Sequence, residues 1–399
     1  MRINREIAHY AITIFLITFA TRATNNMIGT TAPLLARYDL LFPNYLVGFL
    51  VSAVTAINLA SILINARLAR QVRKLLFIAS NALILVLLPA YFLANPLTIW
   101  IVSILTGFAY GLIMPNILTA ASIVGDQFTA ERILVLYTLA LSTSLVAGPL
   151  LETYLLTRFG YRYVFLLFMP LAALSLALSF NVQFPPDPKE PRRSINVKNA
   201  LSNKGLISAL LANSTYSIPF VVFTAFIAIY AQGIYHVSRY LAYFSFVPFF
   251  TTSFLTRLYL TIKVPRGLFK PMLISIALTI IGITLLYLSP SYAVFLASMA
   301  ILGIPHGSVY PLSTLMIARG TSIEERNAVN SYFGVFQGML GIAVPALFGV
   351  SADLMGIRES MALLLIPVIA LAIAFTRFYL NSGFENVRLG VFFSRQGGS

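Results

Sequence analysis

Long apolar runs follow one another along the whole chain, separated by short polar stretches and by breakers such as Asn95-Pro96 and Ser289-Pro290. Each run has roughly 20 residues or more, which is the length a helix needs to cross a bilayer core. The runs lack the alternation of apolar and polar positions that a membrane β-strand shows. The pattern predicts twelve membrane-spanning helices over residues 8–36, 44–66, 74–94, 97–124, 132–156, 162–183, 204–232, 239–262, 269–288, 291–318, 325–352 and 359–380.

Composition agrees with this pattern. Of the 399 residues, 59% are hydrophobic and only 10% are charged, whereas a soluble domain has about 25% charged residues. The first apolar run is too long for the core of a signal peptide, so we interpret it as a spanning helix. The chain has no cysteine, which excludes disulfides and thiol chemistry. We expect an all-α integral membrane protein without a cofactor.

The net charge of +15 reflects where the basic residues lie. If the N-terminus is cytoplasmic, 21 of the 27 Lys and Arg residues fall in inner segments, five fall in outer segments, and Arg22 lies within a span. This bias predicts that both termini are cytoplasmic. Basic residues placed in this way face anionic lipid. We therefore expect a multi-pass protein of the plasma membrane whose partner is the lipid bilayer. We expect it to be a monomer and not to bind nucleic acid.

The longest polar stretch, residues 184–203, contains the run PPDPKEPRRS and predicts a solvated cytoplasmic linker. It separates an N-terminal six-helix bundle, 1–183, from a C-terminal six-helix bundle, 204–380. The residues that remain, 381–399, are expected to form a cytoplasmic tail.

A spaced pattern of Gly, Pro and Arg occurs once in each half. Its members recur 196 residues apart: Gly107 and Gly303, Gly111 and Gly307, Pro115 and Pro311, Pro149 and Pro345, Gly160 and Gly356, Arg162 and Arg358. An offset of six helices makes the repeats parallel, with their symmetry axis along the membrane normal. Small residues at four-residue spacing let helices pack closely. We therefore predict two pseudo-symmetric bundles, with Gly148 adding to the small-residue helix-packing positions.

These residues resemble the major facilitator superfamily over nearly the whole chain. Ser144-x3-Gly148-Pro149 and residues 155–162 are similar to the family's fifth-helix signature and the loop after it, and Gly341-x3-Pro345 is similar to its counterpart in the second half. The sequence departs from the family pattern at Asn65, Ala69, Val72, Ser103 and Glu152-Thr153. The resemblance implies a secondary transporter, and the fifth-helix signature, typical of antiporters, favours efflux.

A polar stripe at helical spacing marks the first span, with Thr18, Arg22, Asn25, Asn26 and Gly29 on one face. An ionisable side chain within a span is costly and needs an explanation. The resemblance implies that helices one, four, seven and ten line a central cavity, so we interpret Arg22, Asn25 and Asn26 as substrate-binding. Alternatively, Arg22 binds helix ends or backbone carbonyls inside its bundle.

The fourth, seventh and tenth spans carry further candidates for the substrate site: Tyr110, Met114, Asn213, Tyr216, His306 and Tyr310. Because histidine titrates near physiological pH, His306 could also couple protons to transport. A buried neutral histidine bonded to a neighbour is the alternative. Asn330 and Gln337, seven residues apart, are interpreted mainly as interhelical hydrogen-bonding groups.

Glu152 is the one carboxylate predicted inside a span, and it is the second candidate for proton coupling. Burial in an apolar environment favours the neutral form of a carboxylic acid. Alternatively, Glu152 is structural and either reaches the outer interface or pairs with Arg158 or Arg162.

Charged residues gather in equivalent inner loops and predict a cytoplasmic gate of ion pairs: Arg70, Arg73, Lys74, Asp126, Glu131, Arg132, Glu324, Glu325 and Arg326. A set of solvated loops with weak pairs is the alternative.

Motif searches exclude several other functions. The sequence has no phosphate-binding Gly-x4-Gly-Lys-Ser/Thr motif, no metal-ligand spacing among its three histidines, and no Gly-x-Ser-x-Gly nucleophile motif. We expect a transporter rather than an enzyme, moving a small organic molecule by alternating access with H⁺ as coupling ion and export favoured. Proton-coupled uptake of an organic anion stays open, as do a non-transporting receptor or scaffold and a membrane-embedded lipid enzyme.

Overall fold

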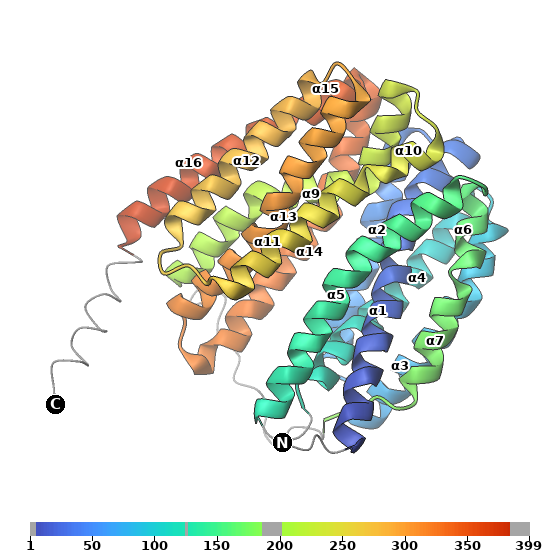
Figure 1. The fold of residues 1–399 in the computed structure, drawn as a ribbon, viewed down its shortest axis with the longest axis vertical. Helices are drawn as coiled ribbons and strands as arrows, with labels where there is room; N and C mark the ends of the chain where they lie inside the picture. Colours follow the sequence, from blue (N-terminus) through green and yellow to red (C-terminus); the bar gives the residue numbers. More distant parts are fainter. Residues whose placement is uncertain (1–4, 124–126, 186–201, 384–399) are drawn as a thin grey trace. The chain divides into compact units, whose positions relative to one another are not determined.

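The computed structural model describes residues 5–123, 127–185 and 202–383, and within these ranges every regular element is a helix (Figure 1). The elements are α1 Arg5–Leu34, the short π-helix η1 Leu35–Asp39, α2 Asn44–Asn65, α3 Arg70–Phe92, α4 Thr98–Ala121, α5 Gln127–Leu156, α6 Tyr161–Leu167, α7 Met169–Ser179, α9 Lys204–Tyr235, α10 Arg239–Phe244, α11 Phe246–Ile262, α12 Phe269–Leu288, α13 Tyr292–Gly320, α14 Ile323–Met355, α15 Ile357–Leu363 and α16 Leu365–Ser382. The prediction of an all-α chain is confirmed for this part of the protein.

Eleven helical segments of the described chain are long and apolar enough to cross a membrane. The predicted eighth span, 239–262, is not among them. It is divided at Ser245 into α10 and α11. Pro248 explains the division: it has no N–H to donate to the carbonyl of Phe244, and its ring crowds that carbonyl. The number of twelve spans stays a prediction.

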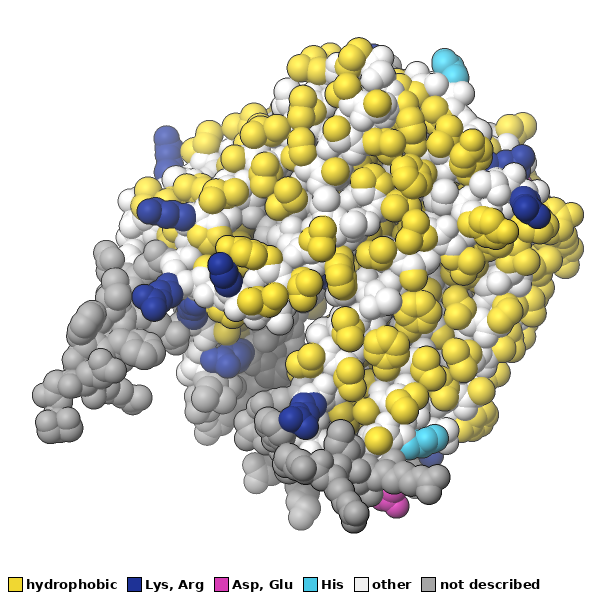
Figure 2. Space-filling view, in the orientation of Figure 1, with side chains coloured by type: hydrophobic (Ala, Val, Ile, Leu, Met, Phe, Trp, Pro, Cys, Tyr) yellow, Lys and Arg dark blue, Asp and Glu magenta, His cyan; other side chains and the backbone are white. Residues whose placement is uncertain are grey.

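Hydrophobic side chains dominate the face seen in Figure 2, on which Lys and Arg are sparse. Large apolar residues stand fully outward, such as Leu354, 80% exposed, and Leu93, 74% exposed. Contiguous apolar surface of this kind marks a face made for lipid or a partner. Together with the long apolar helices, it identifies a multi-pass membrane protein.

The chain forms two compact units. Unit 1 comprises Met1–Pro191, Phe223–Val247 and Gly341–Leu354, and unit 2 comprises Arg192–Val222, Pro248–Leu340 and Met355–Ser399. The predicted bundles, 1–183 and 204–380, therefore stay a prediction. Most of the predicted linker and tail, residues 186–201 and 384–399, lies outside the described residues.

In unit 1, α1 packs against α5 and α7, α2 against α4, and α3 against α4 and α7. The far parts of the sequence join this unit through specific contacts. Asp353 accepts hydrogen bonds from the backbone N–H groups of Asn44 and Tyr45, 3.1 and 2.7 Å, at the start of α2. A carboxylate at this place stabilises unpaired helix N–H groups. Tyr161 donates to Gln232 of α9 at 2.7 Å.

In unit 2, α12 packs against α13, α15 and α16. Arg319, near the end of α13, donates to the carbonyls of Pro265 and Arg266, 2.8 and 2.6 Å, and so holds the loop that precedes α12.

The predicted repeat has a physical counterpart inside each unit. A Cβ at Gly111 would lie 2.5 Å from the Asn58 carbonyl oxygen, and one at Gly307 would lie 2.5 Å from the Ser253 carbonyl oxygen. Only glycine allows such a close backbone approach. The repeated glycines therefore set the distance between α2 and α4 in unit 1, and between α11 and α13 in unit 2.

Candidate functional site

Arg22 lies half-buried on α1, within electrostatic range of the Tyr110 and Tyr137 hydroxyls. No carboxylate forms an ion pair with it in the described part of the chain. Thr18 Oγ1 and Asn26 Nδ2, one turn to either side of Arg22, are buried without a hydrogen-bond partner, and so is the Tyr110 hydroxyl. Buried polar atoms are normally paired. Arg22, Thr18 and Asn26 of α1 and Tyr110 of α4 therefore form a site, the α1–α4 site, that offers a cation and several polar atoms free to bind a ligand.

A buried hydrogen-bond network near Arg22 holds α1 in place. Thr21 and Ser175 are joined at 2.6 Å, and Ser175 donates to Asn81 at 2.7 Å. This chain of bonds links α1, α7 and α3, so Arg22 is presented from a rigid scaffold.

His306 lies buried in unit 2, where its Nδ1 is 2.7 Å from Ser253 Oγ. Aromatic rings surround the imidazole, with centroids 4.4 Å away for Phe220, 5.1 Å for Phe249 and 5.8 Å for Tyr216. The contact with Ser253 matches the alternative prediction of a bonded buried histidine, and a proton-coupling role stays untested.

The remaining candidates on helices α4 and α9 differ in their surroundings. Asn213 donates to Ser217 at 2.6 Å within α9, whereas the Tyr216 hydroxyl is buried without a partner. Met114 is half-buried on α4. No described contact joins these residues into one site, and their substrate-binding role stays a prediction.

Glu152 is completely buried where α1, α5 and α10 meet in unit 1. Thr31 donates to Glu152 Oε2 at 2.9 Å, and the Tyr243 hydroxyl contacts the same carboxyl group. Tyr243 is in turn 2.6 Å from Thr30 Oγ1. Glu152 Oε1 has no hydrogen-bond partner. The sequence did not indicate Tyr243, because the spacing of residues within one helix carries no information about a contact between α10 and α5.

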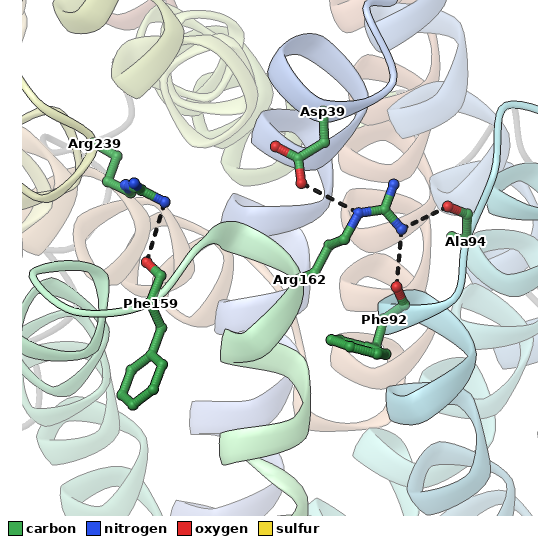
Figure 3. Close-up of polar contacts among 6 residues, drawn as sticks. All are labelled: Asp39, Phe92, Ala94, Phe159, Arg162 and Arg239. Carbon is green, nitrogen blue, oxygen red and sulfur yellow. Dashed lines mark hydrogen bonds and ion pairs between the residues drawn. The ribbon is translucent and has the colours of Figure 1, made fainter.

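The alternative pairing of Glu152 with Arg162 does not occur. Figure 3 shows that Arg162 is instead directed at Asp39, with Nε 3.3 Å from Oδ2, and at the carbonyls of Phe92 and Ala94, both at 2.8 Å. Arg162 thus joins the end of α3 to η1. Arg158 is exposed.

A cavity of about 520 Å³ lies between α13 and α14 in unit 2. Each helix contributes residues about one turn apart, so two stripes face each other: Tyr310, Thr314, Leu315 and Ala318 from α13, and Arg326, Asn330, Phe333, Gly334 and Gln337 from α14. Gln337 Nε2 and Arg326 Nε are buried without a partner. The structure therefore places Asn330 and Gln337 on a cavity, whereas their spacing had suggested interhelical hydrogen bonds.

The predicted cytoplasmic gate stays untested. Asp126 lies outside the described residues, and the side chains of Glu131 and Glu324 are not described. Arg326 donates to the Ala318 carbonyl at 2.9 Å. Among the other predicted members, Arg70, Lys74, Arg132 and Glu325 are exposed and Arg73 is half-buried.

Comparison with known families gives one match, to the model described as Major Facilitator Superfamily, over residues 14–269 and 266–392. No curated protein matches the chain significantly.

Among solved structures, the chain is similar to a point mutant of the nucleoside transporter NupG, with 13% identity, a TM-score of 0.76, and coverage of 93% of this chain and 100% of that one. A POT family transporter in complex with a thioalcohol-conjugated peptide gives 12% identity, a TM-score of 0.76, and coverage of 94% and 96%. A bacterial homologue of the human lysosomal transporter Spinster, inward-facing and unoccupied, gives 14% identity, a TM-score of 0.72, and coverage of 95% of this chain and 99% of that one. At this identity the likeness shows the fold.

Proposed function

Since this chain belongs to the major facilitator superfamily, we propose that it is a secondary active transporter that exports a small organic molecule by alternating access, coupled to protons. The observation that carries this proposal is the α1–α4 site. Within the described residues, a cation without a carboxylate partner lies there beside buried polar atoms of Thr18, Asn26 and Tyr110 that make no hydrogen bond. A bound polar molecule would supply the missing partners. We place the protein in the plasma membrane as a monomer, with both termini cytoplasmic.

Proton coupling is assigned to Glu152. Its carboxyl group is buried with Thr31 and Tyr243 as partners, and no cation is paired with it within the described ranges. A buried unpaired charge is expensive, whereas a neutral acid in the same place is tolerated. Loss of the proton would therefore weaken the junction of α1, α5 and α10, which gives a physical link between proton release and helix movement.

The test is substrate counterflow in proteoliposomes under an imposed pH gradient, with a substrate identified by a ligand-stabilisation screen on the purified protein. Glu152→Gln keeps the size and the hydrogen bond from Thr31 but cannot release a proton. We expect it to retain counterflow, which requires no net proton movement, and to lose uptake driven by the pH gradient.

A matched control is His306→Gln, which changes the second candidate in the other unit. If Glu152→Gln responded to the pH gradient as the wild type does, Glu152 would be structural. If His306→Gln alone abolished the response, coupling would move to His306.

Arg22 provides the test of the substrate site. We expect Arg22→Gln to weaken substrate binding at least tenfold, because a hydrogen bond to a charged group contributes about 1.5–3 kcal/mol. Arg22→Lys keeps the charge and separates electrostatic attraction from shape. Unchanged affinity and transport in Arg22→Gln would remove Arg22 from the site.

Proton-coupled uptake of an organic anion is the second candidate, favoured by the same unpaired Arg22. The direction of substrate flux under a pH gradient separates it from export. A protein of this fold that acts only as a receptor or scaffold would show no counterflow with any ligand it binds.

A further inference from the structure

We propose that the cavity between α13 and α14 is a ligand site of its own, apart from the α1–α4 site, and that it binds an organic anion with Arg326 as the ionic anchor. This inference goes beyond the proposed function and names the chemical class of the ligand: an organic anion with an apolar or aromatic body. The predicted gate gave Arg326 a different role, as a member of an ion-pair network.

The donors in the cavity exceed the acceptors that the protein supplies. Arg326 carries five N–H donors in a planar fork. Within the described residues, Arg326 makes one hydrogen bond, to the Ala318 carbonyl, while Nε is buried without a partner. No acidic residue is among the described residues that line the cavity. A carboxylate or phosphate fits such a fork with two parallel hydrogen bonds.

The guanidinium group of Arg326 favours negative charge in the cavity. In a partly buried site, screening by salt is weaker than at an open surface. The positive potential of Arg326 therefore selects anions over neutral molecules and cations.

The rest of the lining suits an apolar body. The rings of Tyr310 and Phe333 lie with centroids 5.9 Å apart, and Leu315 and Ala318 complete the apolar wall. A volume of about 520 Å³ is within the usual range for a drug-sized ligand. Arg326 and Gln337 are eleven residues apart on α14, about 16 Å along a helix axis. An elongated ligand would thus place its anion at Arg326 and a neutral acceptor at Gln337.

The same anionic chemistry occurs on lipid headgroups, so the experiment compares two sources. Thermal unfolding of the purified protein is measured in neutral detergent with millimolar benzoate or phenyl phosphate, and with benzamide as the neutral analogue of the same shape. A parallel series uses nanodiscs of phosphatidylcholine with or without phosphatidylglycerol and no soluble probe.

We expect the two soluble anions to raise the melting point of the wild type in proportion to the logarithm of their concentration, and benzamide to leave it unchanged. Arg326→Gln should weaken anion binding at least about tenfold, the effect of losing hydrogen bonds to a charged group. The anion affinity of Arg326→Lys should lie between those of the wild type and Arg326→Gln, because lysine keeps the charge and lacks the planar fork of donors. Arg377→Gln, which removes an exposed arginine on α16, is the matched control.

Three results would overturn the proposal: no shift with either anion in the wild type, equal shifts in wild type and Arg326→Gln, or a shift with phosphatidylglycerol alone. If Arg326→Gln does not fold, the wild type against Arg326→Lys still decides, since equal affinity would remove the fork from recognition. Failure of the proposed transport function would give a different result from failure of this anion site. Substrate counterflow would then be absent, while Arg326-dependent anion binding remained.

Discussion

Arg162 and Arg358 occupy the same place in their two repeats and perform the same local task. Arg162 binds the carbonyls of Phe92 and Ala94 at the end of α3, and Arg358 binds those of Tyr287 and Ser289, both at 3.0 Å, at the end of α12. The last carbonyls of a helix have no partner within it, and a cation there also opposes the helix dipole.

We predict that Arg162→Gln lowers the free energy of unfolding by about 1–3 kcal/mol, because charge-assisted hydrogen bonds are lost and Asp39 is left without its cation. Thermal unfolding in detergent measures the change. Arg158→Gln, four residues earlier and exposed, removes the same charge without these bonds. Equal melting points for the two variants would show that the Arg162 contacts contribute nothing.

A residue-level prediction from the sequence is strongest where one helix carries the whole signal. The stripe of Thr18, Arg22 and Asn26 needs only the periodicity of α1, and within the described residues Thr18 Oγ1 and Asn26 Nδ2 are buried without a partner. Its substrate-binding role stays a prediction. Glu152 shows the limit. Its partners Thr31 and Tyr243 come from helices far away in the sequence, and no spacing rule connects them.

At the scale of elements, the repeated glycines control how closely pairs of helices pack. The space that a Cβ at Gly111 needs is occupied by the Asn58 carbonyl oxygen, 2.5 Å away, and by Ser61 Cβ, 2.6 Å away. Both belong to α2, so a side chain at Gly111 would push α2 and α4 apart.

We predict that Gly111→Ala and Gly307→Ala each destabilise the protein by about 1–3 kcal/mol, the usual cost of overpacking. Gly233→Ala is the control, because nothing lies within 4 Å of the added atom. Alanine there should be neutral or stabilising by about 0.5–1 kcal/mol, since it favours the helix. Melting points below the wild type for all three variants would contradict this account.

The helices were predictable because the length and hydropathy of a segment determine whether it forms a helix across a bilayer. The points at which helices are interrupted were harder to predict. Both η1 and the division at Ser245 depend on local backbone geometry, although Pro248 offered a signal for the second. The cavity between α13 and α14 was not predicted, although Arg326, Asn330, Phe333 and Gln337 lie on one face of α14 at helical spacing. Its existence depends on the opposing stripe of α13, and pairing two stripes requires the fold.

At the scale of the molecule, the family and the apolar surface agree with the predicted membrane protein, and the count of spans decides its topology. Eleven helical segments of the described chain qualify as spans, and α10 with α11 would be the twelfth. An odd number would place the two termini on opposite sides of the membrane. The α10–α11 pair therefore determines the sidedness of every loop that follows it.

Cysteine labelling measures this count directly. Because the chain contains no cysteine, no native cysteine has to be replaced before single cysteines are introduced. Ser238 and Lys263 are exposed and flank the α10–α11 pair. If the pair crosses the bilayer, a membrane-impermeant maleimide on intact cells will label Ser238→Cys but not Lys263→Cys, and permeabilised cells will show both. The 24 residues from 239 to 262 are long enough for this at about 1.5 Å per residue, even with a bend at Ser245. Labelling of both variants from outside would mean that α10 and α11 turn back, and that the C-terminus lies outside.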